Sequence, residues 1–333
     1  MFPDPVEIAL PGGHRPAFAL AEARLAAGFA EAAVVKDAGD DPDVTHGALI
    51  RVRVDLAPSG SGITFRAGPG VGTVTRPGLP IPPGEPAINP MPRRMIAAAL
   101  GEIAGGPADA VVEIAVPGGE ALAARTLNGR LGIVGGLSIL GTTGIVVPYS
   151  CAAWIDTIHR GIDVARASGL PHVAGSTGST SEAAVRALHG LPDTALLEMG
   201  DYVGGMLKYL RRHPVPYVTV AGGVAKMTKL AQGRLDLHSK RGVADLPALA
   251  ALVTDPALSR RIAGANTVAE AFTLAAAEAV PLGDVVAASA WRTASAALEG
   301  AAMALEVVLF DRTGALVGRA GFAPVHDGRN RRT

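Results

Sequence analysis

The sequence has a single cysteine, Cys151, among its 333 residues. One cysteine excludes a disulfide within the chain and a zinc site built from several cysteines, and it is compatible with a reducing, cytoplasmic location. An excess of either charge is also lacking, because 30 Lys and Arg residues balance 30 Asp and Glu residues. No overall field therefore attracts nucleic acid or an anionic membrane, and an anionic ligand has to be bound by a local cluster.

Two further absences concern export and membranes. The first residues, MFPDPVEIALPGG, lack a basic segment followed by an apolar run, so no secretory signal is expected. No charged residue occurs between Arg130 and Asp156, a length that would span a bilayer. Two glycine-rich breaks, Pro148 and β-branched runs in this segment favour strands and turns over one continuous helix, so a membrane span is rejected.

Residues 124–150 hold the densest mixture of glycines, hydroxyl residues and β-branched apolar residues in the chain. Apolar runs at 131–134, 137–140 and 145–147 predict short strands, and the glycines between them let the main chain approach a bound group closely. The residues predicted to contact a cofactor here are Gly135, Gly136, Gly141, Thr142 and Thr143. The alternative is a tight crossing of strands in the core, and the GxGxxG fingerprint of dinucleotide binding is not present.

An apolar strand predicted at 32–35 runs into the loop KDAGDDPDVTHG at 36–47. Four aspartates, Lys36 and His46 in one loop with glycine and proline can hold a divalent cation through oxygens or position a general base. The loop lacks the ligand register of an EF-hand, and a solvated turn is the favoured alternative on sequence alone.

The segment 70–94 is rich in proline, which makes it stiff before a ligand arrives. Arg76 lies near its start and Arg93 and Arg94 at its end, where Pro92 is predicted in the first turn of a helix. Guanidinium groups beside a helix N-terminus suit a ligand with carboxylates. Ordinary solvated arginines are the alternative.

The sequence predicts two domains and a tail. Residues 1–150 are predicted as an α+β domain with a mixed sheet, although 21–33 is helix-like. Residues 151–326 are predicted as an α/β domain with a parallel, Rossmann-like βαβ sheet and alanine-rich helices, and 327–333 as a disordered tail. The predicted strands are 172–174, 194–199 and 217–220, and the predicted helices are 152–168, 181–188, 201–211, 224–231, 246–258, 262–277 and 287–303.

Ligands of such a sheet bind at the carboxyl ends of its strands. The loop beginning at Gly175 and Ser176 is predicted to hold the polar part of a nucleoside cofactor, and Glu198 ends the next strand, where an acid accepts ribose hydroxyl protons. The competing interpretation gives Glu198, like Asp201, a charge role at a helix N-terminus. Residues 226–241 form the densest basic run, which either neutralises ligand carboxylates or is a solvated face.

Five blocks of the chain, in order, resemble the CbiD family, the cobalt-precorrin-5B C(1)-methyltransferases. They are the loop 36–47, TRPGLPIPPGEPAINPMPRRMI at 75–96, NGRLGIVGGLSILGTTGIVVPYS at 128–150, LEMGDYVGGMLKYL at 197–210 and AKMTKLAQGRLDLHSKR at 225–241. The resemblance implies a CbiD-like two-domain fold, distinct from the usual tetrapyrrole methyltransferases of that pathway. It also implies a transferase that uses S-adenosylmethionine to methylate C-1 of cobalt-precorrin-5B, giving cobalt-precorrin-6A on the anaerobic route to cobalamin.

The acceptor is then a small corrinoid with many carboxylates, so neither nucleic acid nor membrane is an expected partner, and homo-oligomerisation is left open. Because the cobalt belongs to the substrate, no metal site is predicted in the protein. The residues expected to bind the substrate are Lys36, Arg76, Arg93, Arg94, Arg130, Lys229 and Lys240. The candidates for a base that removes a proton from the macrocycle are Asp40, Asp43, His46 and His238.

The chain also departs from the family pattern. Members usually begin with a TTG motif and an alanine-rich helix, whereas this chain starts at a predicted strand, residues 6–10. The loop GSTGSTSE at 175–182 lacks the arginine expected there. A non-catalytic tetrapyrrole-binding protein is therefore one alternative, and an NAD(P)-dependent oxidoreductase is the other, against which the missing GxGxxG counts.

Overall fold

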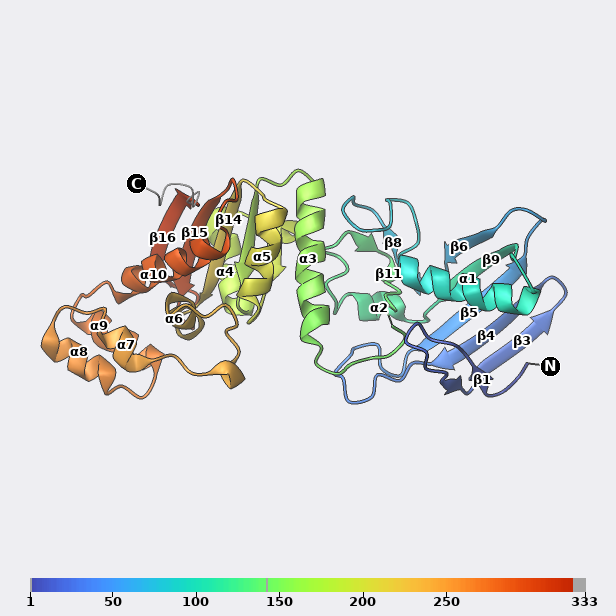
Figure 1. The fold of residues 1–333 in the computed structure, drawn as a ribbon, viewed down its shortest axis with the longest axis horizontal. Helices are drawn as coiled ribbons and strands as arrows, with labels where there is room; N and C mark the ends of the chain where they lie inside the picture. The colour runs from blue at the N-terminus through green and yellow to red at the C-terminus, as the bar shows by residue number, and fades with distance from the viewer. Residues whose placement is uncertain (1, 142, 326–333) are drawn as a thin grey trace. The chain divides into compact units, whose positions relative to one another are not determined.

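The computed structural model describes residues 2–141 and 143–325. Thr142 and the predicted tail at 327–333 lie outside the described residues. The chain divides into two compact units, Met1–Ser150 and Cys151–Thr333 (Figure 1). Within the described ranges, none of the helices combines the length and the apolar character that a membrane span requires.

A mixed five-stranded sheet forms the centre of the first unit. The elements of this unit are β1 (Val6–Glu7), β2 (Ala17–Phe18), β3 (Glu22–Ala26), β4 (Phe29–Val35), β5 (Leu49–Leu56), β6 (Ile63–Ala67), β7 (Gly70–Val71), β8 (Thr73–Val74), α1 (Pro90–Ala104), β9 (Ala110–Ala115), α2 (Gly119–Ala123), β10 (Ile133–Val134) and β11 (Gly136–Leu137). The sheet order is β3-β4-β5-β9-β6, and only β6 and β9 run parallel. Ile96 and Leu100 of α1 pack on the buried cluster that contains Val112 and Ile114 of β9. Short pairs, β1 with β2, β8 with β10 and β7 with β11, complete the unit.

The helix-like interpretation of residues 21–33 is wrong, because this segment is the hairpin of β3 and β4. Ala26 pairs with Phe29, so Ala27 and Gly28 form a two-residue turn, and Gly28 has a φ of 86°. Glycine adopts this left-handed conformation without steric cost. Pairing of β4 along β5 then outweighs the helix propensity of the alanines.

The second unit is a five-stranded sheet with helices on both faces. Its elements are α3 (Cys151–Ala167), β12 (His172–Ser176), α4 (Ser179–His189), η1 (Asp193–Ala195), β13 (Leu196–Glu198), α5 (Val203–Arg212), β14 (Tyr217–Gly223), α6 (Val224–Ala231), η2 (Ser239–Arg241), α7 (Leu246–Ala250), α8 (Pro256–Ala263), α9 (Val268–Ala277), α10 (Leu282–Ala297), β15 (Ala304–Phe310) and β16 (Leu316–Pro324). The order is β13-β12-β14-β15-β16, and all neighbours run parallel except β15 and β16.

Alternation along the strands divides the core of this unit between two faces. Val173, Val218 and Val307 belong to the large cluster that α3, α5, α6 and α10 cover. Ala174 and Val308 belong to a smaller cluster, which α4 covers. The helices and strands thus form a mixed α+β architecture whose second unit carries four parallel strands.

The helix predicted over 246–258 is in fact two helices, α7 and α8. Asp255 caps α8 by accepting hydrogen bonds from the main chain of Ala257 and Leu258, and Pro256 is its first residue. A capping aspartate followed by proline is the local signal for a new helix start.

Candidate functional site

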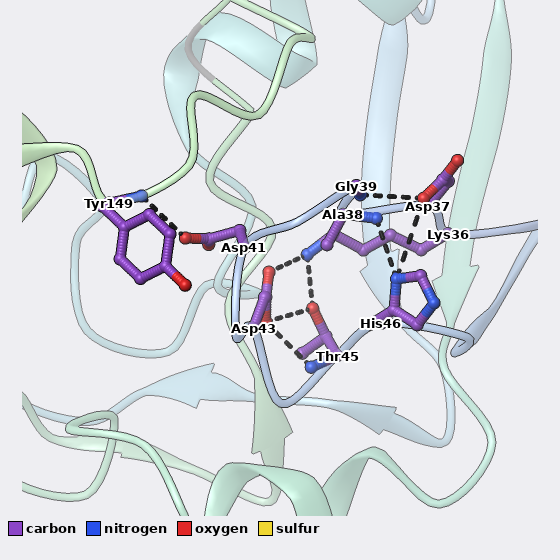
Figure 2. A network of polar contacts seen from close by, with 9 residues as sticks. All are labelled: Lys36, Asp37, Ala38, Gly39, Asp41, Asp43, Thr45, His46 and Tyr149. Atoms are coloured by element: carbon purple, nitrogen blue, oxygen red, sulfur yellow. Dashed lines mark hydrogen bonds and ion pairs between the residues drawn. The ribbon is translucent and has the colours of Figure 1, made fainter.

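The loop between β4 and β5 folds around its own acidic side chains (Figure 2). Lys36 donates to the Asp43 carboxylate and to the Thr45 hydroxyl, and Asp43 Oδ1 accepts from Thr45 N at 2.8 Å. Partial burial alone would raise the pKa of Asp43, but the hydrogen bonds from Lys36 and Thr45 outweigh it and hold this pKa below its usual value. Asp43 is therefore a fixed anion that orders the loop, which makes it a poor proton acceptor.

A second contact joins this loop to residues far along the chain. Asp41 Oδ1 accepts from Tyr149 N at 2.9 Å, across 108 positions of sequence (Figure 2). Asp37 accepts from Gly39 N at 2.8 Å. Asp40 is exposed, and no hydrogen bond or ion pair joins its side chain to the rest of the described chain. Of the four aspartates, Asp40 is thus the one with neither oxygen engaged by another residue of the described chain.

Two of the predicted bases are histidines with the same hydrogen-bond pattern. His46 Nδ1 accepts from Ala38 N at 3.1 Å, and His238 Nδ1 accepts from Lys240 N at 3.1 Å. A neutral ring that accepts at Nδ1 carries its proton on Nε2. Both rings are therefore presented as Nε2–H donors, and neither offers a free nitrogen lone pair without breaking its backbone contact.

The three predicted arginines of the proline-rich loop differ in availability. Arg93 is bound internally, since it pairs with Glu85 at 3.1 Å and donates to the carbonyls of Pro86 and Ile88. Arg94 is exposed, and its Nη2 lies 3.7 Å from the sulfur of Met91. The aliphatic stem of Arg76 lies against Gly132, where an added Cβ would come within 2.5 Å of its Cγ. Arg76 and Arg94 therefore keep their guanidinium groups available for carboxylates.

The glycine-rich segment is built as a close crossing of backbones. An added Cβ at Gly136 would lie 2.3 Å from the main chain of Gly70, because β11 runs directly beside β7. Gly135 forms a turn with a φ of 87°, Gly141 lies beside Pro92, and the Thr143 hydroxyl donates to Ile145 O at 3.0 Å. Close packing against β7 thus accounts for the glycine at 136. The space beside Gly135 is open, so its predicted contact with a cofactor stays a prediction.

Asn128 fixes the start of the same segment. This side chain is 8% exposed, donates to Gly136 O at 3.2 Å and accepts from the Ser138 hydroxyl at 3.2 Å. Arg130 lies two residues further on and is also engaged in an interaction.

In the second unit, the predicted cofactor residues lie at the carboxyl ends of β12 and β13. An added Cβ at Gly175 would lie 2.2 Å from Met206 Sδ, so packing of the methionine requires glycine here. Ser176 is fully buried, and its hydroxyl approaches Glu182 at 3.5 Å. Glu198 pairs with Ser176 between the parallel strands β13 and β12. Its neighbour Leu197 belongs to the core under α3 and α5, and because successive side chains of a strand point to opposite faces, Glu198 lies on the α4 face.

The sequence indicates a charge role at a helix N-terminus for Asp201 and places Lys226 in the basic run, but in the structure the two residues meet at this edge of the sheet. Lys226 Nζ lies 3.1 Å from Asp201 Oδ1 and donates to Thr177 O at 2.9 Å. The Thr177 hydroxyl accepts from Gly223 N at 3.4 Å. These contacts join the loops after β12 and β13 to the end of β14 and the first turn of α6. The signal in the sequence is that each residue lies within a few positions of a predicted strand end, where parallel strands bring their loops together.

The basic run after β14 is only partly available. Lys229 is 9% exposed and donates to Leu237 O at 2.9 Å, and no carboxylate of the described residues pairs with it. Arg241 pairs with Asp236 at 3.4 Å, and Lys240 is exposed in η2. Within residues 2–141 and 143–325, no three His, Cys, Asp or Glu side chains gather as they would around a metal ion.

The comparisons with known proteins agree with one another. The CbiD family model matches residues 1–148, and the model of the CbiD C-terminal domain matches residues 236–321. A cobalt-precorrin-5B C(1)-methyltransferase of Agrobacterium fabrum is 62% identical and aligns over 100% of this chain and 91% of its own length. A protein of the same name from a Bradyrhizobium species is 64% identical over 98% of this chain and 89% of its own length.

Among solved structures, the cobalamin biosynthesis protein (cbiD) of Archaeoglobus fulgidus is 24% identical, with 66% of this chain and 67% of that chain covered and a TM-score of 0.33. Identity above 60% over nearly the full length of two relatives decides the assignment. The chain belongs to the CbiD family.

Proposed function

We propose that this protein methylates C-1 of cobalt-precorrin-5B in cobalamin biosynthesis and yields cobalt-precorrin-6A. The observation that carries this proposal is the 62% and 64% identity to two methyltransferases of that name over at least 98% of the chain. The methyl donor is S-adenosylmethionine, whose sulfonium releases a methyl group to a carbon nucleophile and becomes a neutral thioether. Such a transfer needs alignment of donor and acceptor and exclusion of water rather than a strongly nucleophilic side chain.

The second unit is the proposed donor-binding unit because of the order of its strands. Numbered along the chain, its strands lie in the order 2-1-3-4-5, which is a doubly wound order with the ligand crevice between the first and third strands. Those strands are β12 and β14; Thr177 and Gly178 follow β12, whereas β14 ends with Gly222 and Gly223 and is followed directly by α6. Asp201 and Lys226 form their ion pair at the same edge of the sheet.

Arg76 and Arg94 of the first unit are proposed to bind carboxylates of the corrinoid. Both keep their guanidinium groups available, and Arg94 lies in the second turn of α1. Arginine binds a carboxylate through two parallel hydrogen bonds, which gives orientation as well as affinity. The cobalt is bound by the macrocycle and is part of the substrate.

Asp40 is proposed as the group that accepts a proton from the macrocycle when the new carbon–carbon bond has formed. Its loop is held by Lys36, Asp43 and Asp41, so the exposed carboxylate sits on an ordered support. Asp43 is already engaged as an anion, and His46 presents an N–H, which leaves Asp40 as the best-placed acceptor in this loop.

Calorimetric titration with S-adenosylhomocysteine, the reaction product, tests the donor. We expect a Kd in the micromolar range or tighter, about −8 kcal/mol or better. Turnover is then followed with trideuteromethyl-labelled donor and cobalt-precorrin-5B, with mass spectrometry of the corrinoid. Nicotinamide nucleotide binding in place of S-adenosylhomocysteine would support an oxidoreductase, and corrinoid binding without either would support a carrier.

The role of Asp40 is tested with Asp40→Asn against Asp37→Asn, which removes the same charge from the same loop. We expect Asp40→Asn to lower turnover by about 100-fold with unchanged product affinity, and Asp37→Asn to retain turnover near that of the wild type. Equal turnover in the two variants would remove Asp40 from the mechanism.

A further inference from the structure

The carboxylate of Asp201 lies where the carboxyl ends of β12, β13 and β14 come together. It belongs to the loop after β13, and Lys226 of the first turn of α6 lies 3.1 Å from its Oδ1. The same ammonium donates to Thr177 O, directly after β12. Asp201 is therefore held beside the carboxyl ends of β12 and β14, which is where the strand order predicts a ligand.

Asp201 Oδ1 is shielded from solvent and accepts no hydrogen bond, and it is the one side-chain atom of this kind in the described part of the chain. The approach of Lys226 is an ion pair, but its geometry is not that of a hydrogen bond. Lys226 therefore holds the carboxylate by charge rather than by a hydrogen bond, and the Asp201 side chain remains 23% exposed, so a ligand hydroxyl can reach its exposed part.

We propose that Asp201 binds the ribose hydroxyls of an adenosine-containing ligand, with Lys226 positioning its carboxylate. A carboxylate accepts hydrogen bonds from the two neighbouring hydroxyls of a ribose, and an acid near the end of a strand has this role in nucleotide-binding sheets. The choice of S-adenosylmethionine as that ligand rests on the proposed function. The inference transfers the ribose contact from Glu198, which faces α4, to Asp201.

The test compares two ligands in three proteins. S-adenosylhomocysteine and its 2′-deoxyribose analogue are titrated calorimetrically into the wild type, Asp201→Ala and Glu198→Ala. We expect the wild type to bind the ribose form about 10- to 100-fold more tightly than the deoxy form, the range for one hydrogen bond to a charged group. Asp201→Ala should lose that preference, with a similar Kd for both ligands, whereas Glu198→Ala should keep it.

The outcomes separate this inference from the proposed function. If the wild type binds S-adenosylhomocysteine and Asp201→Ala keeps the preference for the ribose form, or if Glu198→Ala abolishes it instead, the assignment of Asp201 is overturned and the methyltransferase stands. If the chain binds NAD⁺ with the same dependence on Asp201 and does not bind S-adenosylhomocysteine, the ribose site stands and the donor of the proposed function falls. Absence of binding to both ligands overturns both. Asp201→Asn, together with circular dichroism of each variant, excludes misfolding as the cause of any loss.

Discussion

Glu306 is a fully buried carboxylate whose replacement should destabilise the second unit strongly. It is 0% exposed in β15, and its oxygens accept from His189 Nε2 at 2.6 Å, Thr219 Oγ1 at 2.9 Å and Arg319 Nε at 2.8 Å. Because the Thr219 hydroxyl proton points to Glu306, its oxygen accepts from His172 Nε2, 2.9 Å away. The network therefore contains a chain of donors that all end at one anion.

Glu306→Gln tests this network with almost no change in volume. The amide has one acceptor oxygen, so it can face either Arg319 or the pair of His189 and Thr219, and its NH₂ group then opposes donors on the other side. Arg319 is 44% exposed and can turn to water, which limits its share of the loss. A hydrogen bond to a charged group contributes about 1.5–3 kcal/mol, so we expect the free energy of unfolding to fall by about 2–4 kcal/mol.

The measurement is urea unfolding followed by fluorescence in a Trp154→Phe background. The remaining Trp291 donates to Leu305 O at 2.8 Å, next to Glu306 in the same strand, so its emission reports on this sheet. With a urea m-value of about 1–3 kcal/mol per molar, the midpoint should fall by about 1–2 M. Glu278→Gln is the matched control, because Glu278 forms an exposed pair with Arg261 and should change stability by less than about 1 kcal/mol. A loss of less than about 0.5 kcal/mol for Glu306→Gln would refute the reasoning.

Three further predictions concern stability. Burial, and then the charge of His189, lower the pKa of His172 to about 4, whereas the ring in the unfolded chain binds a proton below about pH 6.5. The free energy of unfolding should therefore fall by about 1–2 kcal/mol from pH 6.5 to 4, a value discounted for partial exposure, and the urea midpoints of His172→Gln should depend less on pH across this range. Gly70→Ala should destabilise the first unit by about 3 kcal/mol or more in the same assay, because the added Cβ would lie 1.8 Å from a carbonyl oxygen, whereas Gly13→Ala, with open space around it, should cost about 1–2 kcal/mol. Asp43→Ala should lower the free energy of unfolding by about 1–3 kcal/mol and so lower the thermal midpoint, because Lys36 loses its carboxylate partner. Unchanged stability together with lost turnover would instead indicate that Asp43 acts as a base.

The sequence predicts the second unit better than the first for a physical reason. Its strands and helices alternate, and each boundary carries local punctuation, so the helix predicted at 224–231 has the bounds of α6. In the first unit, the alanines of residues 21–33 favour a helix locally, and the hairpin is decided by pairing with β5, which is remote in sequence. The split of residues 246–258 was readable from Asp255 and Pro256, since an N-cap and a first-turn proline mark a new helix.

The candidate site divides in the same way between local and long-range information. The loop 36–47 was identified from composition, but the availability of Asp40 depends on which partners its neighbours find, among them Tyr149 at a separation of 108 residues. Glu198 was predicted from its place at a strand end, and the register that turns it to the α4 face appears only in the sheet. Lys226 and Asp201 are 25 residues apart, and only the strand order brings them together.

The contrast between the two carboxylates of the second unit, Glu306 and Asp201, supports different roles for them. Glu306 lies in the first half of β15, where donors from α4, β14 and β16 satisfy both of its oxygens. Asp201 lies at the opposite, carboxyl edge of the parallel strands, where one oxygen is shielded and is paired with Lys226 without a hydrogen bond. The fold engages Glu306 completely, whereas the Asp201 side chain remains 23% exposed at the edge where such sheets bind ligands, which supports a ligand-binding role for Asp201 and a structural role for Glu306.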